Sequence, residues 1–498
     1  MCAALVLLTN PALADTSLEA AIDTTTPQLL RQFSVPGAAV ALIRKGEVVW
    51  MRGYGFADVA TARRVTPDTL FNVGSISKTA TAWGVMRLVE TGKLGLDQPV
   101  DSYLSRWHVP ASNFDAQQVT ARRLLSHTAG ISAHGYGGSD PARPLSTVED
   151  SLTGKTGTGA VQLTAAPGAG HNYSGANYRI LELAIEEISG QPFQAWMRTE
   201  IFARLGMKST RFDLPAPDGP ALATPYDGFS KPLPALRYQD LSAAGLSSSL
   251  RDLAGFTAAA LPDARHRKRA GRGVLQPATL AQMATPAPNS RWIDRDPFGP
   301  MPQYGLGYTV RPAQFAGMTG IGHGGSNSGW ESLIQAIPAT GDGIVIMTNS
   351  SNGSALIAAL LCEWRRSAAA AAAAAECPTI AVKIPMLAAY DGGGIEPAIA
   401  LYRKMRVAAV DSYDWSVPQL NSLGYLLMRA GDVPGAVRIF QLNAETYPRE
   451  WNVFDSLGEA YARAGDKARA VEAYRRSVAL NPHNDNGREA LRQLGAPP

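Results

Sequence analysis

The 498 residues are too many for one typical hydrophobic core and predict two or three domains. Hydrophobic residues make up 45% of the chain and charged residues 18%, which fits a globular protein with a large core, and the net charge of +4 argues against a nucleic-acid binder or a strongly anionic partner. No apolar run reaches the roughly 18–20 residues that a membrane-spanning helix needs.

The first residues have features of an export signal. Ala3 to Leu8 form a short apolar stretch, and Ala12-Leu13-Ala14 fits a signal-peptidase site, so we expect a partial signal peptide over residues 1–14 and a mature chain from Asp15. The alternative is an ordinary N-terminal helix, which Pro11 disfavours. The expected location is periplasmic or secreted.

The next segment mixes strand and helix patterns. Apolar runs at Ala38–Ile43 and Val48–Trp50 flank Lys45-Gly46 and predict a hairpin. A helical apolar face follows from Ile76 to Thr91. Gly343–Thr348 reads as a buried strand, with a helix beginning near Ser354. Residues 15–366 are therefore expected to form one α/β domain with a mixed sheet and a helical subdomain.

Residues 367–395 are expected to connect two domains, because they contain an eight-alanine run, Ala368–Ala375, and a triple glycine, Gly392–Gly394. Cys362 and Cys377 flank the alanine run. A continuous helix between them would hold them about 22 Å apart, far beyond disulfide reach. We therefore expect two unpaired, buried thiols, since pairing requires a helix break near Arg366 or Glu376.

The last hundred residues repeat with a period of 34. Five features recur in register: Leu423-Gly424, Gly431-Asp432, Ala436, Phe440 and Pro448 return as Leu457-Gly458, Gly465-Asp466, Ala470, Tyr474 and Pro482. This is the tetratricopeptide period and predicts an all-α repeat domain over residues 396–498. A degenerate unit near Glu396–Val410 and a capping helix near Arg488–Leu494 are expected to complete the stack, which would bind a protein partner. The alternative is a pair of ordinary helical hairpins.

The candidate catalytic residues begin at Ser75-Ile76-Ser77-Lys78, where the predicted helix starts. Residues three apart are neighbours on a helix, so the Lys78 amine can reach the Ser75 hydroxyl and take its proton. The helix N-terminus supplies N–H groups where negative charge develops.

Further motifs lie around this pair. From about Val35 to Arg366 the chain resembles the serine β-lactamase, penicillin-binding-protein, D-Ala-D-Ala carboxypeptidase and esterase superfamily. Besides Ser75 and Lys78, the resemblance rests on Leu124-Leu125-Ser126-His127-Thr128-Ala129-Gly130, Tyr173-Ser174-Gly175, Ala244-Gly245-Leu246-Ser247, Tyr304-Gly305-Leu306-Gly307-Tyr308 and Gly322-His323-Gly324-Gly325.

The resemblance implies a role for each matching residue. Tyr173 matches the tyrosine of the second family motif and is expected to act as a base or proton shuttle beside Lys78. His323-Gly324-Gly325 matches the third motif, on a strand that lines the substrate site. The N–H groups of Ser75 and Ser326 are the expected oxyanion hole.

Two positions depart from the family pattern. Gly175 stands where the second motif usually has asparagine, and Asn177 follows two residues later as a candidate substrate contact. His323 stands where many β-lactamases carry lysine, which removes a fixed cation from the position that grips a substrate carboxylate. Both departures favour an esterase-like or peptidase-like member.

Other motifs are set aside. Lys155-Thr156-Gly157 precedes Tyr173, in the wrong order for the third motif, and His127 is interpreted as a loop-packing residue. No metal-ligand spacing occurs, and neither a metal nor a cofactor is expected. The predicted function is a serine acyl-hydrolase that acts on a small-molecule or peptide amide, β-lactam or ester. The alternative is a catalytically weak, penicillin-binding-like sensor that recruits partners through its repeats.

Overall fold

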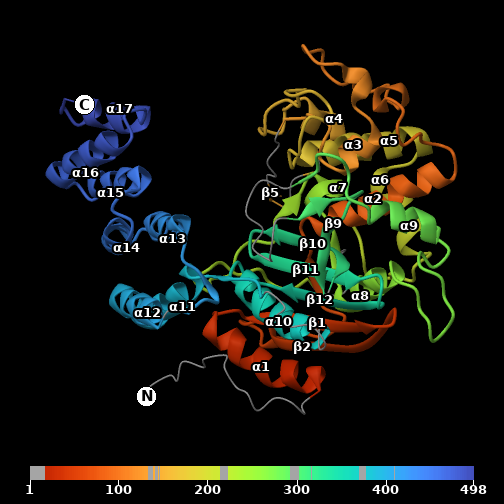
Figure 1. Cartoon of the computed structure of the whole chain (residues 1–498), viewed down its shortest axis with the longest axis horizontal. Helices are drawn as coiled ribbons and strands as arrows, with labels where there is room; N and C mark the ends of the chain where they lie inside the picture. Colours follow the sequence, from red (N-terminus) through yellow and green to blue (C-terminus); the bar gives the residue numbers. More distant parts are fainter. Residues whose placement is uncertain are drawn as a thin grey trace. The chain divides into compact units, whose positions relative to one another are not determined.

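The computed structural model describes residues 17–132, 138–140, 144, 146–212, 222–291, 302–315, 317–368, 377–408 and 410–497. The contacts divide the chain into two compact units, Met1–Pro378 (unit 1) and Thr379–Pro498 (unit 2) (Figure 1). The expected signal peptide, residues 1–14, lies outside the described residues. None of the helices in the described part of the chain is both long and apolar enough to cross a membrane.

Unit 1 is organised around a sheet that combines N-terminal and C-terminal strands. Among the described residues the sheet has eight strands in the order β3-β2-β1-β12-β11-β10-β9-β8. The strands are β1 (Gly37–Arg44), β2 (Glu47–Asp58), β3 (Arg63–Arg64), β8 (Gln303–Tyr304), β9 (Thr309–Phe315), β10 (Met318–Asn327), β11 (Trp330–Ile337) and β12 (Asp342–Thr348). The expected fold class is confirmed with one refinement. Neighbouring strands in this sheet run antiparallel, whereas a mixed sheet contains both parallel and antiparallel pairs. The sheet instead combines strands from the N-terminal and the C-terminal part of unit 1.

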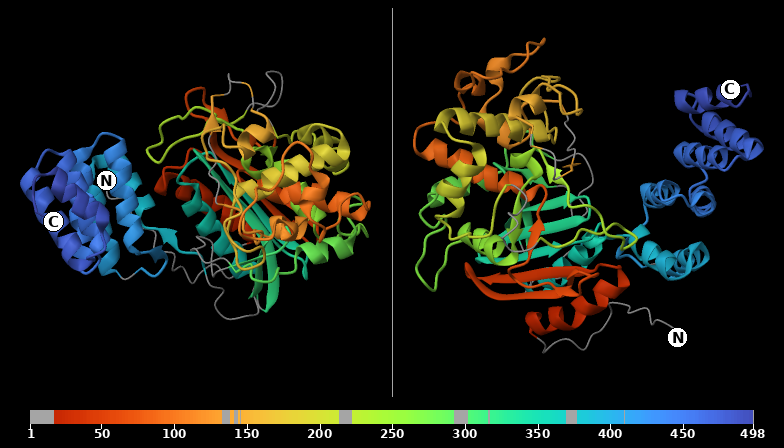
Figure 2. Two further views of the ribbon diagram at one scale, coloured as in Figure 1. Left: turned by 90° about the horizontal axis from the view of Figure 1, so that it is seen from above. Right: turned by 180° about the vertical axis from the view of Figure 1, so that it is seen from behind.

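Helices cover both faces of the sheet. α1 and α10 pack against strands β2, β11 and β12, and α2 and α8 pack on the other side, together with further helices of the middle of the chain (Figures 1 and 2). Because both faces are covered, β1, β11 and β12 are buried along almost their whole length. The helices are α1 (Leu18–Gln32), α2 (Ile76–Glu90), α3 (Ala121–Leu125), α4 (Val148–Leu152), α5 (Gly175–Ser189), α6 (Phe193–Met197), α7 (Leu241–Ala244), α8 (Leu250–Ala259), α9 (Pro277–Met283) and α10 (Gly353–Ala368), with short helical turns η1 (Val100–Tyr103), η2 (Ala116–Gln118) and η3 (Arg198–Phe202).

The local predictions in this unit are confirmed. Lys45 and Gly46 both have positive φ angles in the turn between β1 and β2. Helix α2 ends at Glu90, and Gly92 follows with φ of +70°. Two short strand pairs bring distant segments together: β4 (Leu70–Asn72) pairs with β7 (Ser247–Ser249), and β5 (Gly138–Ser139) with β6 (Arg237–Tyr238).

The prediction of two unpaired cysteines is wrong. Cys362, on α10, and Cys377 form a disulfide, with their Cα atoms 4.8 Å apart. The prediction assumed a continuous helix across the alanine run, and that separation is incompatible with such a helix. Cys377 lies outside α10, in a segment without regular secondary structure, so the condition for pairing, a helix break, is met.

Unit 2 consists of helical hairpins. Its helices are α11 (Lys383–Gly393), α12 (Ile395–Val407), α13 (Val417–Arg429), α14 (Val433–Thr446), α15 (Trp451–Arg463), α16 (Lys467–Leu480) and α17 (Asp485–Gln493), and a small parallel pair joins β13 (Ile380–Ala381) to β14 (Tyr413–Asp414). The first helices of successive hairpins, α11, α13 and α15, begin at residues 383, 417 and 451, so each starts 34 residues after the one before. The expected linker over residues 367–395 therefore needs correction at its C-terminal end, because Lys383–Gly393 is the first helix of this unit.

The repeated glycines mark where the two helices of a hairpin meet. A Cβ on Gly424 of α13 would lie 2.5 Å from Cζ of Phe440 on α14, and one on Gly458 of α15 would lie 2.9 Å from the ring of Tyr474 on α16. These two hairpins each pack an aromatic ring against a glycine, which explains why both positions recur between them in the sequence.

Candidate active site

Ser75 is the N-cap residue of α2, and Lys78 lies one turn further along the helix. The Lys78 Nζ atom is 3.1 Å from Ser75 Oγ, as the three-residue spacing predicts. Ser75 is partly accessible, whereas the side chain of Lys78 is fully buried. The arrangement joins a reachable hydroxyl to an amine that is shielded from water.

The surroundings of Lys78 favour its neutral, basic form. Burial holds the pKa of Lys78 well below its ordinary value, although the carboxylate of Asp240 acts in the opposite direction and raises it. The amine also donates a hydrogen bond to the carbonyl oxygen of Ala243 at 2.8 Å. A lysine amine with a depressed pKa can accept the proton of a neighbouring serine near neutral pH.

Two glycines let strand β10 approach the start of α2. A Cβ on Gly74 would lie 2.7 Å from the backbone nitrogen of Ser326, and a Cβ on Gly325 would overlap the carbonyl oxygen of Val73 and lie 3.2 Å from the nitrogen of Ser75. The strand that carries Ser326 therefore runs directly beside the turn that carries Ser75. This proximity is what an oxyanion hole built from the N–H groups of Ser75 and Ser326 requires.

His127 holds Tyr173 in place beside Lys78. The Lys78 Nζ atom lies 4.8 Å from the centre of the Tyr173 ring. The residues on either side of Tyr173 bind His127: Asn172 N–H donates to its carbonyl oxygen at 2.8 Å and Ser174 N–H to its Nδ1 at 3.2 Å. The imidazole also packs against the Tyr173 ring, with ring centres 4.3 Å apart. His127 is thus more than the loop-packing residue that the sequence suggested.

Asn177 supports His127 instead of lining the substrate site. It is 1% exposed on α5, and its Nδ2 donates to His127 Nδ1 at 2.9 Å. The pKa of His127 lies well below its ordinary value, and burial is the largest cause. A neutral imidazole agrees with the hydrogen bonds, because Nδ1 accepts two of them and therefore carries no proton. The expectation that Asn177 contacts substrate is not supported by this placement, since its amide is turned toward the imidazole.

His323 lies on β10, buried and neutral. Its Nδ1–H donates to the carbonyl oxygen of Gly324 at 2.5 Å, and its Nε2 accepts from the Tyr304 hydroxyl at 2.6 Å. Burial and, to a lesser extent, the nearby Lys78 lower the pKa of His323 to about 3. The third motif therefore presents a hydrogen-bonded imidazole without charge, as expected from the absence of lysine there.

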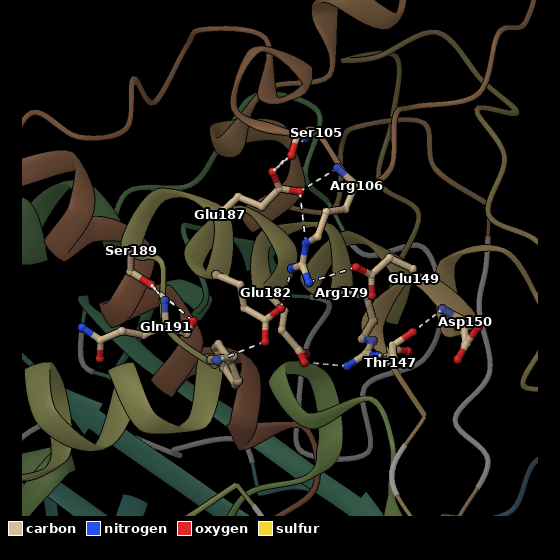
Figure 3. A network of polar contacts seen from close by, with 12 residues as sticks. Ser105, Arg106, Thr147, Glu149, Asp150, Arg179, Glu182, Glu187, Ser189 and Gln191 are labelled. Carbon is tan, nitrogen blue, oxygen red and sulfur yellow. Dashed lines mark hydrogen bonds and ion pairs between the residues drawn. The ribbon is translucent and has the colours of Figure 1, made fainter.

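The carbonyl that holds Lys78 belongs to α7, and a buried ion network fixes this short helix. Arg179, on α5, contacts Glu182 at 2.7 Å and Asp240 at 3.1 Å, and all three side chains are at most 6% exposed. Glu182 accepts from Ser242 N–H at 3.1 Å, which ties α7 to α5. Figure 3 shows Arg179 and Glu182 together, with Thr147 beside Arg179. Asp240 therefore has three roles: it is the N-cap residue of α7, it pairs with Arg179, and its carboxylate raises the pKa of Lys78.

Replacing Asp240 by asparagine is expected to move the acid limb of the kcat/KM profile to lower pH. The Asp240 carboxylate raises the pKa of Lys78, so its loss lowers that pKa, and the amine stays unprotonated in more acidic solution. The measurement is a pH–rate profile with a neutral ester, with circular dichroism as a check on folding. Asp97→Asn is the matched control, because Asp97 pairs with Arg122 at the surface. A limb that stays in place or moves to higher pH would contradict the assignment.

The sequence named the candidate reacting residues but not the residues that support them. Arg179 and Glu182 carried a usable signal, since two opposite charges three residues apart stand within the apolar face of a helix. Tyr304 belongs to one of the motifs that carry the family resemblance, but the sequence assigned it no role. Lys155, which was set aside in the sequence, is 73% exposed and pairs with Asp150. Within the described residues no cluster of His, Cys, Asp or Glu is arranged to hold a metal ion.

Comparisons with known proteins match two parts of the chain to known families. A family model described as Beta-lactamase matches residues 22–360, and one described as Tetratricopeptide repeat matches residues 451–484. Esterase EstB of Burkholderia gladioli is 31% identical over 235 residues, 44% of this chain and 60% of the esterase. The putative penicillin-binding protein PbpX of Bacillus subtilis is 33% identical over 185 residues, 37% of this chain and 43% of that protein. The chain thus spans less than two thirds of the length of either relative.

A solved structure is similar to a large part of this chain. The octameric penicillin-binding protein homologue from Pyrococcus abyssi matches with a TM-score of 0.58 and 26% sequence identity, over 68% of this chain and 77% of that one.

Proposed function

Because the chain belongs to the β-lactamase family, we propose that it is a serine acyl-hydrolase that forms an acyl-enzyme on Ser75. The observation that carries the proposal is the Lys78 amine, fully buried and 3.1 Å from Ser75 Oγ, with a pKa held well below its ordinary value. This is an activated nucleophile in the sense that serine hydrolases require.

In the proposed reaction, Ser75 Oγ attacks the carbonyl carbon of an ester or amide while Lys78 takes the hydroxyl proton. The N–H groups of Ser75 and Ser326 donate to the oxygen that becomes negative. Tyr173 relays the proton to the leaving alcohol or amine, and the bond to the leaving group breaks. Water then attacks the carbonyl carbon of the acyl-enzyme and gives its proton to the same pair of residues. The pair returns a proton to Ser75 Oγ as the bond between Oγ and the acyl carbon breaks and the acid leaves. Neither a metal nor another cofactor takes part in this scheme.

His323, Gly324 and Gly325 form the wall along which the substrate would lie in this scheme. A neutral imidazole donates or accepts hydrogen bonds but offers a substrate carboxylate no fixed positive charge. This property favours esters and amides over substrates that are recognised through a carboxylate.

The function is tested by intact-mass measurement after incubation with three compounds: a penicillin, a p-nitrophenyl ester and a peptide ending in D-Ala-D-Ala. We expect a transient acyl adduct and catalytic release of p-nitrophenol from the ester. A long-lived penicillin adduct without turnover of any of the three would instead favour the competing function, a penicillin-binding sensor. Gly175, at the motif position that is usually asparagine, is the feature of the chain that favours that alternative.

We further propose that residues 15–366 hold the hydrolase and that the helical module for a protein partner, expected over residues 396–498, begins with α11 at Lys383, in a periplasmic or secreted protein. The proposal for the module rests on hairpins that recur every 34 residues and on the match to the tetratricopeptide repeat. The proposal for location rests on the export features of residues 1–14.

A chain truncated after Pro378 is expected to keep its turnover of small esters and to lose any partner that the full-length protein retains. This end point keeps Cys377, so the disulfide to Cys362 can still form. Ester kinetics and a pull-down from the cell envelope, run on both forms, provide the measurement. Loss of ester turnover in a truncated chain that circular dichroism finds folded would assign the repeats to the active site.

A further inference from the structure

The proposed oxyanion hole takes its two N–H groups from elements that are far apart in the sequence. Ser75 stands at the start of α2, and Ser326 lies near the end of β10. In a working oxyanion hole both donors lie about 2.7–3.1 Å from the oxygen that becomes negative. The separation of the two elements therefore has to be held, and the close packing at Gly74 and Gly325 sets only how near they can come.

A single oxygen atom connects the two halves of the hole. Asn72 Oδ1 accepts a hydrogen bond from the N–H group of Gly74 at 2.9 Å, and Gly74 directly precedes Ser75. The same Oδ1 accepts from the side-chain amide of Asn327 at 2.6 Å, and Asn327 directly follows Ser326. Asn72 is 4% exposed, so these bonds are largely shielded from water, which strengthens them.

The first of these bonds shapes the turn that carries the nucleophile. An asparagine side chain that accepts from the N–H group two residues further on forms an Asx turn, which bends the chain. Gly74 completes the bend with φ of +52°, a left-handed conformation that glycine adopts without strain. The side chain of Asn72 therefore fixes the direction of the chain as it passes from the end of β4 to Ser75.

Helix α7 anchors both asparagines. The carbonyl oxygen of Ala244, its last residue, accepts from Asn327 Nδ2 at 3.0 Å and from Asn72 Nδ2 at 3.4 Å. A carbonyl oxygen only accepts, so both amides must present their Nδ2 atoms to α7. The preceding carbonyl oxygen, that of Ala243, accepts from the Lys78 amine. Two successive carbonyls of α7 therefore bind the proposed base and the two asparagines.

We infer that Asn72 and Asn327 are positioning residues, and that the hydrogen bond between them sets the separation of the Ser75 and Ser326 N–H groups. The inference rests on the proposed hydrolase function and adds the residues that preorganise its oxyanion hole. Losing an oxyanion donor outright slows a reaction by about 10²–10³-fold, and a misplacement of about 1 Å can cost about 10²-fold. Without this bond both N–H groups remain but are no longer held, so we expect a loss of about 10–10²-fold.

The test compares Asn327→Ala with the unaltered protein on p-nitrophenyl acetate and its thiono analogue, in which sulfur replaces the carbonyl oxygen. Sulfur is larger than oxygen and a weaker hydrogen-bond acceptor, so an intact oxyanion hole discriminates against it. The unaltered protein should prefer the ester, after correction for the rates of both compounds with hydroxide. In Asn327→Ala, kcat/KM for the ester should fall by about 10–10²-fold and the preference for oxygen by about tenfold. Asn327 is partly exposed, so alanine there should not prevent folding, which circular dichroism checks.

Asn72→Ala should reduce the same preference. The double variant should lose little more than the more damaged single variant, because the two residues share one hydrogen bond. The matched control is Asn352→Ala. The Asn352 amide also donates to two backbone carbonyl oxygens, those of Phe33 and Gly228, each at 3.0 Å. This variant should lose stability but keep the preference for oxygen of the unaltered protein.

Two results would overturn the inference. One is an unaltered protein that hydrolyses the ester without preference over its thiono analogue. The other is a folded Asn327→Ala variant that keeps the original preference, whether its rates are unchanged or equally reduced for both substrates. Ester turnover by the unaltered protein would still support the hydrolase in both cases. If neither substrate is turned over and a fluorophosphonate fails to label Ser75, the hydrolase proposal falls, and this inference falls with it.

Discussion

Ser75→Ala is expected to lower turnover of every ester and amide substrate by about 10⁴–10⁶-fold, the range seen when a serine hydrolase loses its nucleophile. The physical reason is that Ser75 Oγ lies 3.1 Å from the buried Lys78 amine, which is proposed to take its proton and so make this oxygen the nucleophile. Steady-state kinetics and labelling with a fluorescent fluorophosphonate give the two measurements.

The same variant should fold normally. Although Ser75 is the N-cap residue of α2, its side chain makes no capping hydrogen bond, so its loss is expected to change the free energy of unfolding by less than about 1 kcal/mol. Ser77→Ala is the contrasting control, because the Ser77 hydroxyl bonds both Gly74 O and Leu246 N–H and has a structural role. Labelling that persists in Ser75→Ala would identify a different nucleophile.

Lys78→Met and Tyr173→Phe should each slow acylation or deacylation by about 10²–10⁴-fold, the usual effect of removing a general base. Methionine fills the buried space of the Lys78 side chain but has no amine. A slower reaction in this variant therefore reports the loss of the amine rather than a loss of packing. Phenylalanine keeps the ring that packs against His127 and removes the hydroxyl alone. Pre-steady-state measurement of p-nitrophenol release resolves the two steps.

The double variant tests whether Lys78 and Tyr173 act together. If they form one proton-transfer unit, its loss of rate should be close to that of the more damaged single variant and well below the product of the two losses. Tyr178→Phe is the matched control for Tyr173, since the Tyr178 ring lies 5.8 Å from Lys78 Nζ and its hydroxyl donates to Leu125 O. Full activity in Tyr173→Phe would remove this tyrosine from the mechanism.

The sequence was informative wherever chemistry depends on local geometry. Ser75 and Lys78 meet because residues three apart on a helix are neighbours, and the β1–β2 turn follows from Lys45-Gly46. Tyr173 and His323 were located through motifs in a fixed order, and the structure places both around Lys78 and Tyr304. In these cases the relevant partner is either within one helical turn or part of a quoted motif.

Predictions failed where the partner comes from a distant segment. The carbonyl that binds Lys78 lies 165 residues further along the chain, and the His127 imidazole that holds Ser174 lies 47 residues before it. Neither contact leaves a local pattern in the sequence. Asn177 was expected to contact substrate because it is close to Tyr173 in the sequence. Its position on α5 instead directs its side-chain amide toward His127. The cysteine prediction failed because it extended helical geometry across a segment where the helix does not continue to Cys377.

The disulfide also adds a second covalent connection, beside the backbone, between α10 and the residues just before unit 2. Cys377 stands just before Thr379, where unit 2 begins, and its bond to Cys362 reaches α10, which packs against the sheet. The bond therefore closes the backbone between Cys362 and Cys377 into a covalent loop. A protease that cuts once within this loop leaves one covalent molecule under oxidising conditions and two fragments after reduction.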